Sequence, residues 1–279
     1  MFSIPNTVAS DSVDLNIFKT IKTDDGPIDV ASSINGTWLF VLTVKGDLLI
    51  YSTANSRLEA KIDIGEHVDQ IKAGPMEDLL ILSSRKNKTL QLIILDFIQY
   101  INVSGSPFKG PEDAPVVVAV FSDFEWGGCA RLVPVLEQVL EKYPEDVKIA
   151  FKNFPFPGHK YAMKAAIAAL AAHSQGKFWK FHDMLFKNYN QLNDEIIFDI
   201  ALLLGFDETE FKKKMEDSAI QERIRQDISD GQRSAIRATP SVFINGRLLR
   251  NQTPQGLQTA IDRELLKLGK KVAKPAFWN

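Results

Sequence analysis

The sequence predicts a chain of two domains, an all-β domain followed by an α/β domain that carries an inserted α-helical domain. The first prediction rests on short segments rich in Val, Ile, Leu and aromatic residues, parted by Gly, Asn and Pro turns. The second rests on alternating strand and helix patterns, interrupted by a long helical stretch at about 157–236. The predicted boundaries are 1–103 for the β domain, 104–115 for a linker dense in Gly, Pro and Ser, and 116–279 for the α/β domain.

The β domain is expected to consist of two similar units. Strands are predicted at 18–22, 28–32, 38–43, 47–52, 58–64, 68–73, 79–83 and 89–95. The pattern repeats after about 40 residues, because Leu39-Phe40-Val41-Leu42 recurs as Leu79-Leu80-Ile81-Leu82. Two units of four strands with this period resemble the blades of β-propellers of the YVTN or WD type, although no Trp-Asp signature is present.

Two blades cannot close a propeller ring, which typically takes about four to eight. The units are therefore expected to pack on each other as a small sandwich, on the second domain or on another chain. A plain antiparallel sandwich without a true repeat is the alternative. Because an unclosed array leaves sheet edges that need a partner or a cover, we expect a homodimer through this domain.

Composition and charge argue against several classes of function. A formal net charge of -2 and a pI of about 6.1 give no basic field for nucleic acid. No run approaches 18 apolar residues, so no membrane span is expected, and residues 1–5 do not have the pattern of a signal peptide. The single cysteine allows no intramolecular disulfide, and with four scattered His residues it forms no metal motif. No cofactor is expected.

The stretch 116–134 is the centre of the α/β domain. An apolar run at 116–121 predicts a buried strand, an acidic turn follows, and Trp126-Gly127-Gly128-Cys129 opens a helical pattern that contains Pro134. A second strand is predicted at 147–154, and a hairpin of strands 241–244 and 247–250 surrounds Asn245-Gly246. Helices are predicted at 131–143, 161–172, 177–188, 194–204, 208–215, 218–236 and 254–268.

Four motifs spread over residues 106–268 carry a family likeness. They are Phe121-Ser122-Asp123-Phe124, Cys129 five residues before Pro134, the run Lys177-Phe178-Trp179-Lys180-Phe181-His182-Asp183, and Thr239-Pro240-Ser241-Val242-Phe243-Ile244-Asn245-Gly246. Together they resemble the DsbA-like thioredoxin proteins, which are mostly bacterial. The resemblance implies an α/β thioredoxin fold with an inserted α-helical domain, thiol–disulfide oxidoreductase activity, and a periplasmic or otherwise extracytoplasmic location.

The chemistry of that family takes two cysteines in the turn that opens the helix. The first attacks the substrate as a thiolate at the helix N-terminus, and the second resolves the mixed disulfide. On this pattern Trp126 stands at the first position and Cys129 at the second, so the site reads W-G-G-C. Dithiol exchange is therefore expected to be lost. Two interpretations of Cys129 stay open: a monothiol with residual redox chemistry, and a small buried hydrophobic residue.

Peptide binding without turnover is the alternative function. Gly127 and Gly128 leave first-turn N–H groups uncovered, which suits a peptide carbonyl or an anion, or they mark a turn that relaxed once redox tuning was no longer needed. The resemblance implies a cis peptide bond at Thr239-Pro240 and a loop that pairs with an extended polypeptide. A binding module would hold unfolded polypeptide beside Trp126 and Pro240. A third function is an assembly protein in which the β domain matters most.

A Cys–His hydrolase is not favoured by the sequence. His159 and His182 are the candidates for a partner of Cys129, but no third residue that would orient the imidazole is identifiable. His182 lies in an aromatic run at helical spacing and is expected to be a packed helix residue.

Overall fold

The computed structural model describes residues 16–76 and 78–270, and the chain divides into two compact units, 1–96 and 97–279. The expectation for residues 1–5 lies outside the described residues. The unit boundary precedes the predicted linker. Residues 104–115 belong to the second unit, where β8 (Phe108–Lys109) joins the sheet and the C=O of Pro107 accepts the N–H of Phe151 at 2.9 Å. Gly105 and Pro111 lie in turns, in which the N–H of Ser106 donates to the C=O of Val103 and the N–H of Ala114 donates to the C=O of Pro111.

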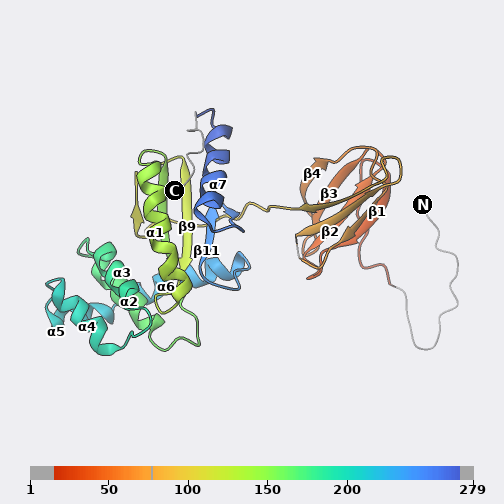
Figure 1. Ribbon diagram of the computed structural model, residues 1–279. Helices are drawn as coiled ribbons and strands as arrows, with labels where there is room; N and C mark the ends of the chain where they lie inside the picture. The colour runs from red at the N-terminus through yellow and green to blue at the C-terminus, as the bar shows by residue number, and fades with distance from the viewer. Residues whose placement is uncertain (1–15, 77, 271–279) are drawn as a thin grey trace. The chain divides into compact units, whose positions relative to one another are not determined.

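The first unit is built from antiparallel sheets (Figure 1). One has the order β1-β2-β3-β4, formed by Pro27–Ser32, Trp38–Thr43, Asp47–Ser52 and Leu58–Asp63. The other has the order β5-β6-β7, formed by Gln70–Ala73, Leu79–Ser84 and Thr89–Ile94. Alternate side chains of a pleated strand point to opposite faces, and the central strands β2 and β3 are buried on both: Phe40 and Ile50 lie on one face, and Val41, Leu49 and Tyr51 lie on the other.

Two details differ from the predicted repeat. Residues 18–22 form no strand, because their apolar side chains do not alternate; Ile21 instead packs against Leu49 and Tyr51. Residues 58–63, predicted to open the second unit, form β4 and pair with β3 through a short hairpin. In the described part of the chain the sheets therefore have four and three strands instead of four each.

The second unit has a five-stranded sheet of order β12-β11-β9-β10-β8. At its centre β9 (Val116–Ser122) runs parallel to β10 (Val147–Asn153) and antiparallel to β11 (Ser241–Ile244), which continues into β12 (Arg247–Leu248). β9 is apolar along nearly its whole length, as a strand covered on both faces must be. On one face α1 (Gly127–Lys142) and α7 (Pro254–Lys267) pack through Leu132, Val139 and Ile261.

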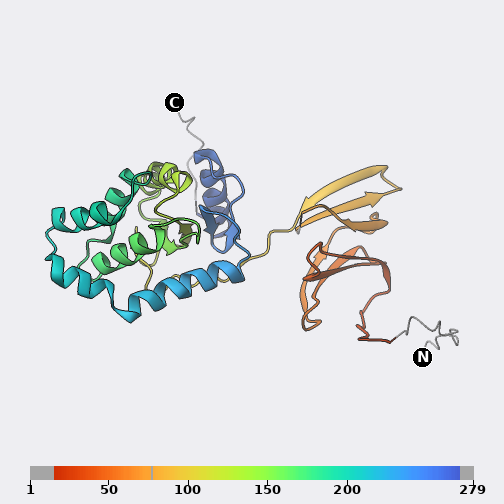
Figure 2. The same cartoon turned by 90° about the horizontal axis from the view of Figure 1, so that it is seen from below.

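The predicted helical insertion is present between β10 and β11. It consists of α2 (Ala162–His173), α3 (Phe178–Lys187), α4 (Asp194–Leu203), α5 (Glu208–Met215) and α6 (Ser218–Arg233). Helices α2–α5 gather at one side of the sheet, and the long α6 returns from them (Figure 2). The predicted thioredoxin fold with inserted helices is thus confirmed. No helix among the described residues is long and apolar enough to cross a membrane.

Candidate functional site

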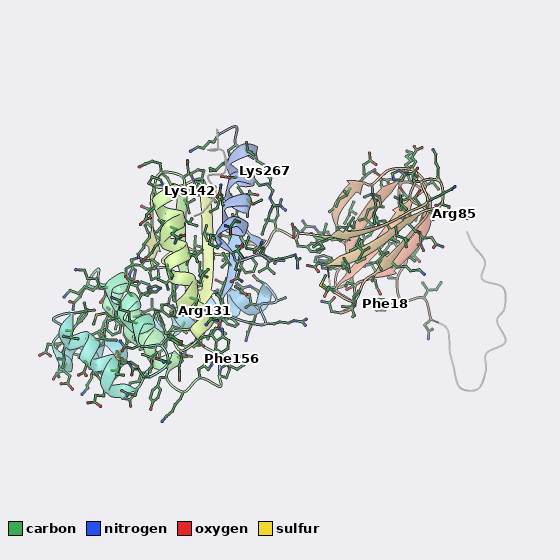
Figure 3. All side chains as sticks on the ribbon, in the orientation of Figure 1. Phe18, Arg85, Arg131, Lys142, Phe156 and Lys267 are labelled. Atoms are coloured by element: carbon green, nitrogen blue, oxygen red, sulfur yellow. The ribbon has the colours of Figure 1, made fainter. Side chains whose placement is uncertain are left out.

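Trp126 caps the helix that follows the central strand. Its backbone is extended, with φ −103° and ψ 121°, and its C=O accepts the N–H groups of Cys129 at 3.0 Å and Ala130 at 3.2 Å. Gly127 and Gly128 therefore form the first turn of α1. Figure 3 shows Arg131 and Phe156 at the end of the unit where α1 begins, whereas Lys142 and Lys267 lie at the opposite end.

Cys129, the only cysteine of the chain, is enclosed by this turn and by the neighbouring loops. Its side chain is 1% exposed, and its Sγ accepts the N–H of Asp123 at 3.4 Å. Burial raises the pKa of the thiol, and hydrogen bonds with Ser122, the Asp123 N–H and Thr239 oppose this rise only in part. Since the thiolate is the nucleophile, a buried thiol with a raised pKa is poorly reactive at neutral pH.

The indole of Trp126, unlike the Cys129 thiol, reaches solvent. It is 46% exposed and stacks on His159 with ring centroids 5.8 Å apart. A Cβ at Gly128 would come within 2.5 Å of the indole Nε1 and 3.3 Å of Pro240 Cδ, and a Cβ at Gly127 within 2.9 Å of Tyr189 Cε2. Close packing of aromatic rings therefore requires both glycines. The sequence suggested two interpretations of Gly127 and Gly128: a site for an anion or a carbonyl, or a relaxed turn. Packing against aromatic rings was not among them.

The loop before β11 completes the site. The Thr239–Pro240 peptide bond is cis, and both residues are half-buried. The side-chain amide of Gln252 donates to the C=O of Pro240 at 2.9 Å and holds the loop. Within the described chain no backbone hydrogen bond engages the N–H or C=O of Thr239. The structure thus brings Cys129, Gly128, Thr239, Pro240 and the Trp126 indole together, and places Gly127 beside them.

Asp123 is the site residue that the sequence interpretation missed. Its carboxylate is 1% exposed; Oδ1 accepts the N–H of Glu125 at 2.8 Å, and Oδ2 accepts the N–H of Phe156 at 2.7 Å. His159 Nδ1 lies 2.9 Å from the same Oδ2. Asp123 is therefore the orienting group for His159 that the sequence did not reveal. The two residues are 36 positions apart on different turns, and no spacing rule links them.

His182, the other imidazole considered, is a packed helix residue, as predicted. Phe124, Phe151 and four further aromatic or polar side chains surround its ring, and its Nδ1 lies 2.7 Å from Asp183 Oδ1. Burial lowers the pKa of His182, and the contact with Asp183 raises it in part. No group of three or more His, Cys, Asp or Glu residues in the described ranges is arranged to hold a metal ion.

The fold and site define a thioredoxin-fold protein with a single buried thiol, and the comparisons with known proteins agree. A family model described as thioredoxin matches residues 102–263. Oxidised BdbD from Bacillus subtilis has the same fold, with a TM-score of 0.56, 23% identity, and coverage of 61% of this chain and 98% of that one. The chain belongs to the thioredoxin family, among its DsbA-like members.

Two curated relatives show how far the likeness extends. A probable disulfide bond formation protein D from Bacillus anthracis is 33% identical over 169 residues, covering 57% of this chain and 77% of that protein. An Na⁺/H⁺ antiporter NhaA 3 from Salinispora tropica is 31% identical over 166 residues, covering 59% of this chain. The chain spans about a quarter of the length of such antiporter relatives.

Proposed function

We propose that the second unit holds extended or unfolded polypeptide on the surface beside Trp126 and the cis-Pro240 loop, without dithiol exchange. One observation carries the proposal. Where the family's attacking thiol is expected, the chain presents the half-exposed indole of Trp126, and its only thiol is 1% exposed. A chain with one cysteine cannot alternate between a dithiol and an internal disulfide.

The surface around Trp126 has the character of a peptide-binding site. Trp126 is 46% exposed and Phe156 is 52% exposed, and both rings pack against His159. Exposed aromatic rings that are already fixed in position offer apolar contact at low entropic cost. The backbone of Thr239, whose side chain bonds with Cys129, makes no backbone hydrogen bond in the described chain and can pair with an extended strand, as in β-augmentation.

Residual monothiol chemistry at Cys129 is the second candidate. It is favoured by the hydrogen bonds from the Asp123 N–H and with Ser122 and Thr239, all of which lower the pKa of the thiol against the effect of burial. An external thiol such as glutathione would have to resolve the mixed disulfide. Insulin reduction with glutathione, compared between the wild type and Cys129→Ser, tests this candidate; equal rates remove Cys129 from the mechanism.

Peptide binding distinguishes the two functions. We expect Trp126→Ala to weaken binding of a labelled, cysteine-free unfolded peptide by about tenfold, because the main apolar contact is lost. Cys129→Ser should bind as the wild type does. Leu203→Ala removes another exposed apolar side chain, on α4, and serves as the matched control. Equal binding by Trp126→Ala and the wild type, measured by fluorescence anisotropy, would contradict the proposal.

A gain of function tests the assignment of position 126. Trp126→Cys places a thiol at the N-terminus of α1, three residues before Cys129. We expect this variant to catalyse disulfide exchange, and the same change in a Cys129→Ser background to catalyse much less. A variant that folds but remains inert would mean that residue 126 does not occupy the attacking position. The extracytoplasmic location implied by the resemblance is also a proposal, which cell fractionation of the native host tests.

A further inference from the structure

The second sheet of the β unit ends in a strand with unusual side chains. β7 lies at the edge of the order β5-β6-β7, and its sequence, Thr-Leu-Gln-Leu-Ile-Ile, contains no charged residue. The edge strand β4 of the first sheet carries Glu59, Lys61 and Asp63. Charged residues on an edge strand oppose pairing with another chain, and an uncharged apolar edge favours it. β7 therefore lacks the protection that β4 has.

Three apolar side chains of β7 form one exposed stripe. Leu90 is 72% exposed, Leu92 is 67% exposed and Ile94 is 46% exposed. Alternate residues of a strand point to the same face of the sheet, so these three side chains lie in a row. A row of this kind along a sheet edge is a typical place for association.

The backbone of the same residues faces away from the sheet. Next to β7, the N–H of Leu95 donates to the C=O of Asp78 at 2.8 Å, on the side of β6. Along an antiparallel pair of strands, residues whose backbone hydrogen-bonds to the neighbouring strand alternate with residues whose backbone points away from it. Leu90, Leu92 and Ile94 therefore direct their N–H and C=O groups away from β6, where no described strand pairs with them.

We propose that β7 pairs antiparallel with β7 of a second copy of this chain, about a two-fold axis at Leu92. In this register Leu92 faces Leu92 of the partner subunit, and Leu90 faces Ile94 of the partner subunit. The outward backbone groups of the three residues meet their counterparts, and the two apolar stripes become continuous. A sheet of six strands results, with the order β5-β6-β7 mirrored across the axis.

A second copy is the occupant that this strand fits best. When the strand is turned about Leu92, every apolar residue of the stripe in one copy faces a Leu or Ile of the other copy, and no like charges meet. Such an isologous contact closes at two copies, so an exposed apolar edge does not lead to open-ended association. The dimer concerns the first unit and does not depend on the peptide-binding function proposed for the second.

Sedimentation of the full chain over a range of concentrations tests the proposal. We expect a monomer–dimer equilibrium in the wild type, weakened at least about tenfold by Leu92→Lys, which opposes two like charges at the axis. Ile62→Lys makes the same change on β4, at a residue that is 39% exposed, and should leave the equilibrium unchanged. Because both residues face solvent to a large extent, both variants should fold, which circular dichroism and unfolding midpoints check.

Crosslinking tests the register. In a Cys129→Ser background, Leu92→Cys should give a disulfide-linked dimer on oxidation, since directly bonded antiparallel pairs have Cα atoms about 5.5 Å apart, within disulfide range. A mixture of Leu90→Cys and Ile94→Cys chains should crosslink to each other, and neither alone should do so efficiently. A wild type that is monomeric at every concentration, or a dimer that Leu92→Lys leaves intact, would overturn the proposal.

Discussion

His159 Nδ1 lies 2.9 Å from Asp123 Oδ2, the carboxylate oxygen that also accepts the N–H of Phe156 at 2.7 Å. This contact joins the turn after β10 to the turn after β9. The imidazole in turn supports the Trp126 indole, which stacks on it. The exposed ring of the proposed binding surface is therefore positioned by a carboxylate that is itself 1% exposed.

Removing this carboxylate should destabilise the second unit and loosen Trp126. Asp123→Ala leaves the N–H groups of Phe156 and Glu125 without their acceptor, and both hydrogen bonds are part-buried. An unsatisfied group costs about 1–3 kcal/mol when it is fully buried, so we expect a total loss of about 1–3 kcal/mol in the free energy of unfolding, measured with a chemical denaturant. Asp123→Asn keeps one acceptor oxygen and should lose less. Equal stability of Asp123→Ala and the wild type would contradict this role.

The effect of Gly128→Ala on the free energy of unfolding should depend on the residue at position 126. In the wild type the new Cβ would lie 2.5 Å from the indole Nε1, so the ring has to move and stability should fall. In a Trp126→Ala background the indole is absent, and Ala is favoured over Gly in a helix by about 1 kcal/mol. We therefore expect Gly128→Ala to destabilise the wild type and to be neutral or stabilising in Trp126→Ala. Denaturant unfolding of all four proteins measures the coupling; additive effects would contradict the packing account.

The sequence predicted the scaffold of this site better than its contacts. The strand at 116–121, the helix after it, the inserted helices and the Thr239-Pro240 loop follow from local patterns and family motifs, and the structure brings residues 126–129 and 239–240 together. The Asp123–His159 contact and the packing of Tyr189 against Gly127 join segments 36 and 62 residues apart, which no local pattern encodes. In the β unit, the repeat placed residues 58–63 in the wrong sheet, because self-similarity of the sequence does not decide which neighbouring strand a strand pairs with.

Lower pH should weaken the second unit through His182. Burial lowers the pKa of His182 below its ordinary value of about 6.5, so the unfolded chain binds a proton more readily than the folded one. Stability should be constant above about pH 7.5 and fall as the pH decreases through about 6.5, until the folded imidazole is protonated too. His182→Leu should reduce this fall, measured as the free energy of unfolding between pH 5 and 8 in steps of about one pH unit. An unchanged pH dependence would contradict the assignment.

Asp183 provides the control for that experiment. Its contact with His182 raises the imidazole pKa against the effect of burial. Asp183→Asn should therefore lower the pKa of His182 further and increase the loss of stability below about pH 6.5. His173, whose pKa burial also lowers, contributes in the same direction and remains in both variants, so the difference between their pH profiles reports on His182.

The ion pairs of Lys152 should make the largest single electrostatic contribution to the stability of the second unit. Its Nζ lies 2.6 Å from Asp227 Oδ1 and 2.8 Å from Asp230 Oδ2, and it donates to the C=O of Asn102 at 2.7 Å. The three charged side chains are at most 1% exposed. Lys152→Met leaves two buried carboxylates without this cation, and breaking a buried pair of this kind costs about 3–5 kcal/mol.

The comparison variant is Lys164→Met, whose ion pair with Asp194 is largely exposed and should contribute about 0–1 kcal/mol. A loss below about 1 kcal/mol in Lys152→Met would mean that Arg223 and Arg233, which also contact these carboxylates, compensate fully. Because Lys152 on β10 holds α6, and α6 ends shortly before the Thr239–Pro240 loop, Lys152→Met should also weaken peptide binding at temperatures where the unit is still folded. Lys164→Met should leave peptide binding unchanged, and fluorescence anisotropy with the same labelled peptide measures both.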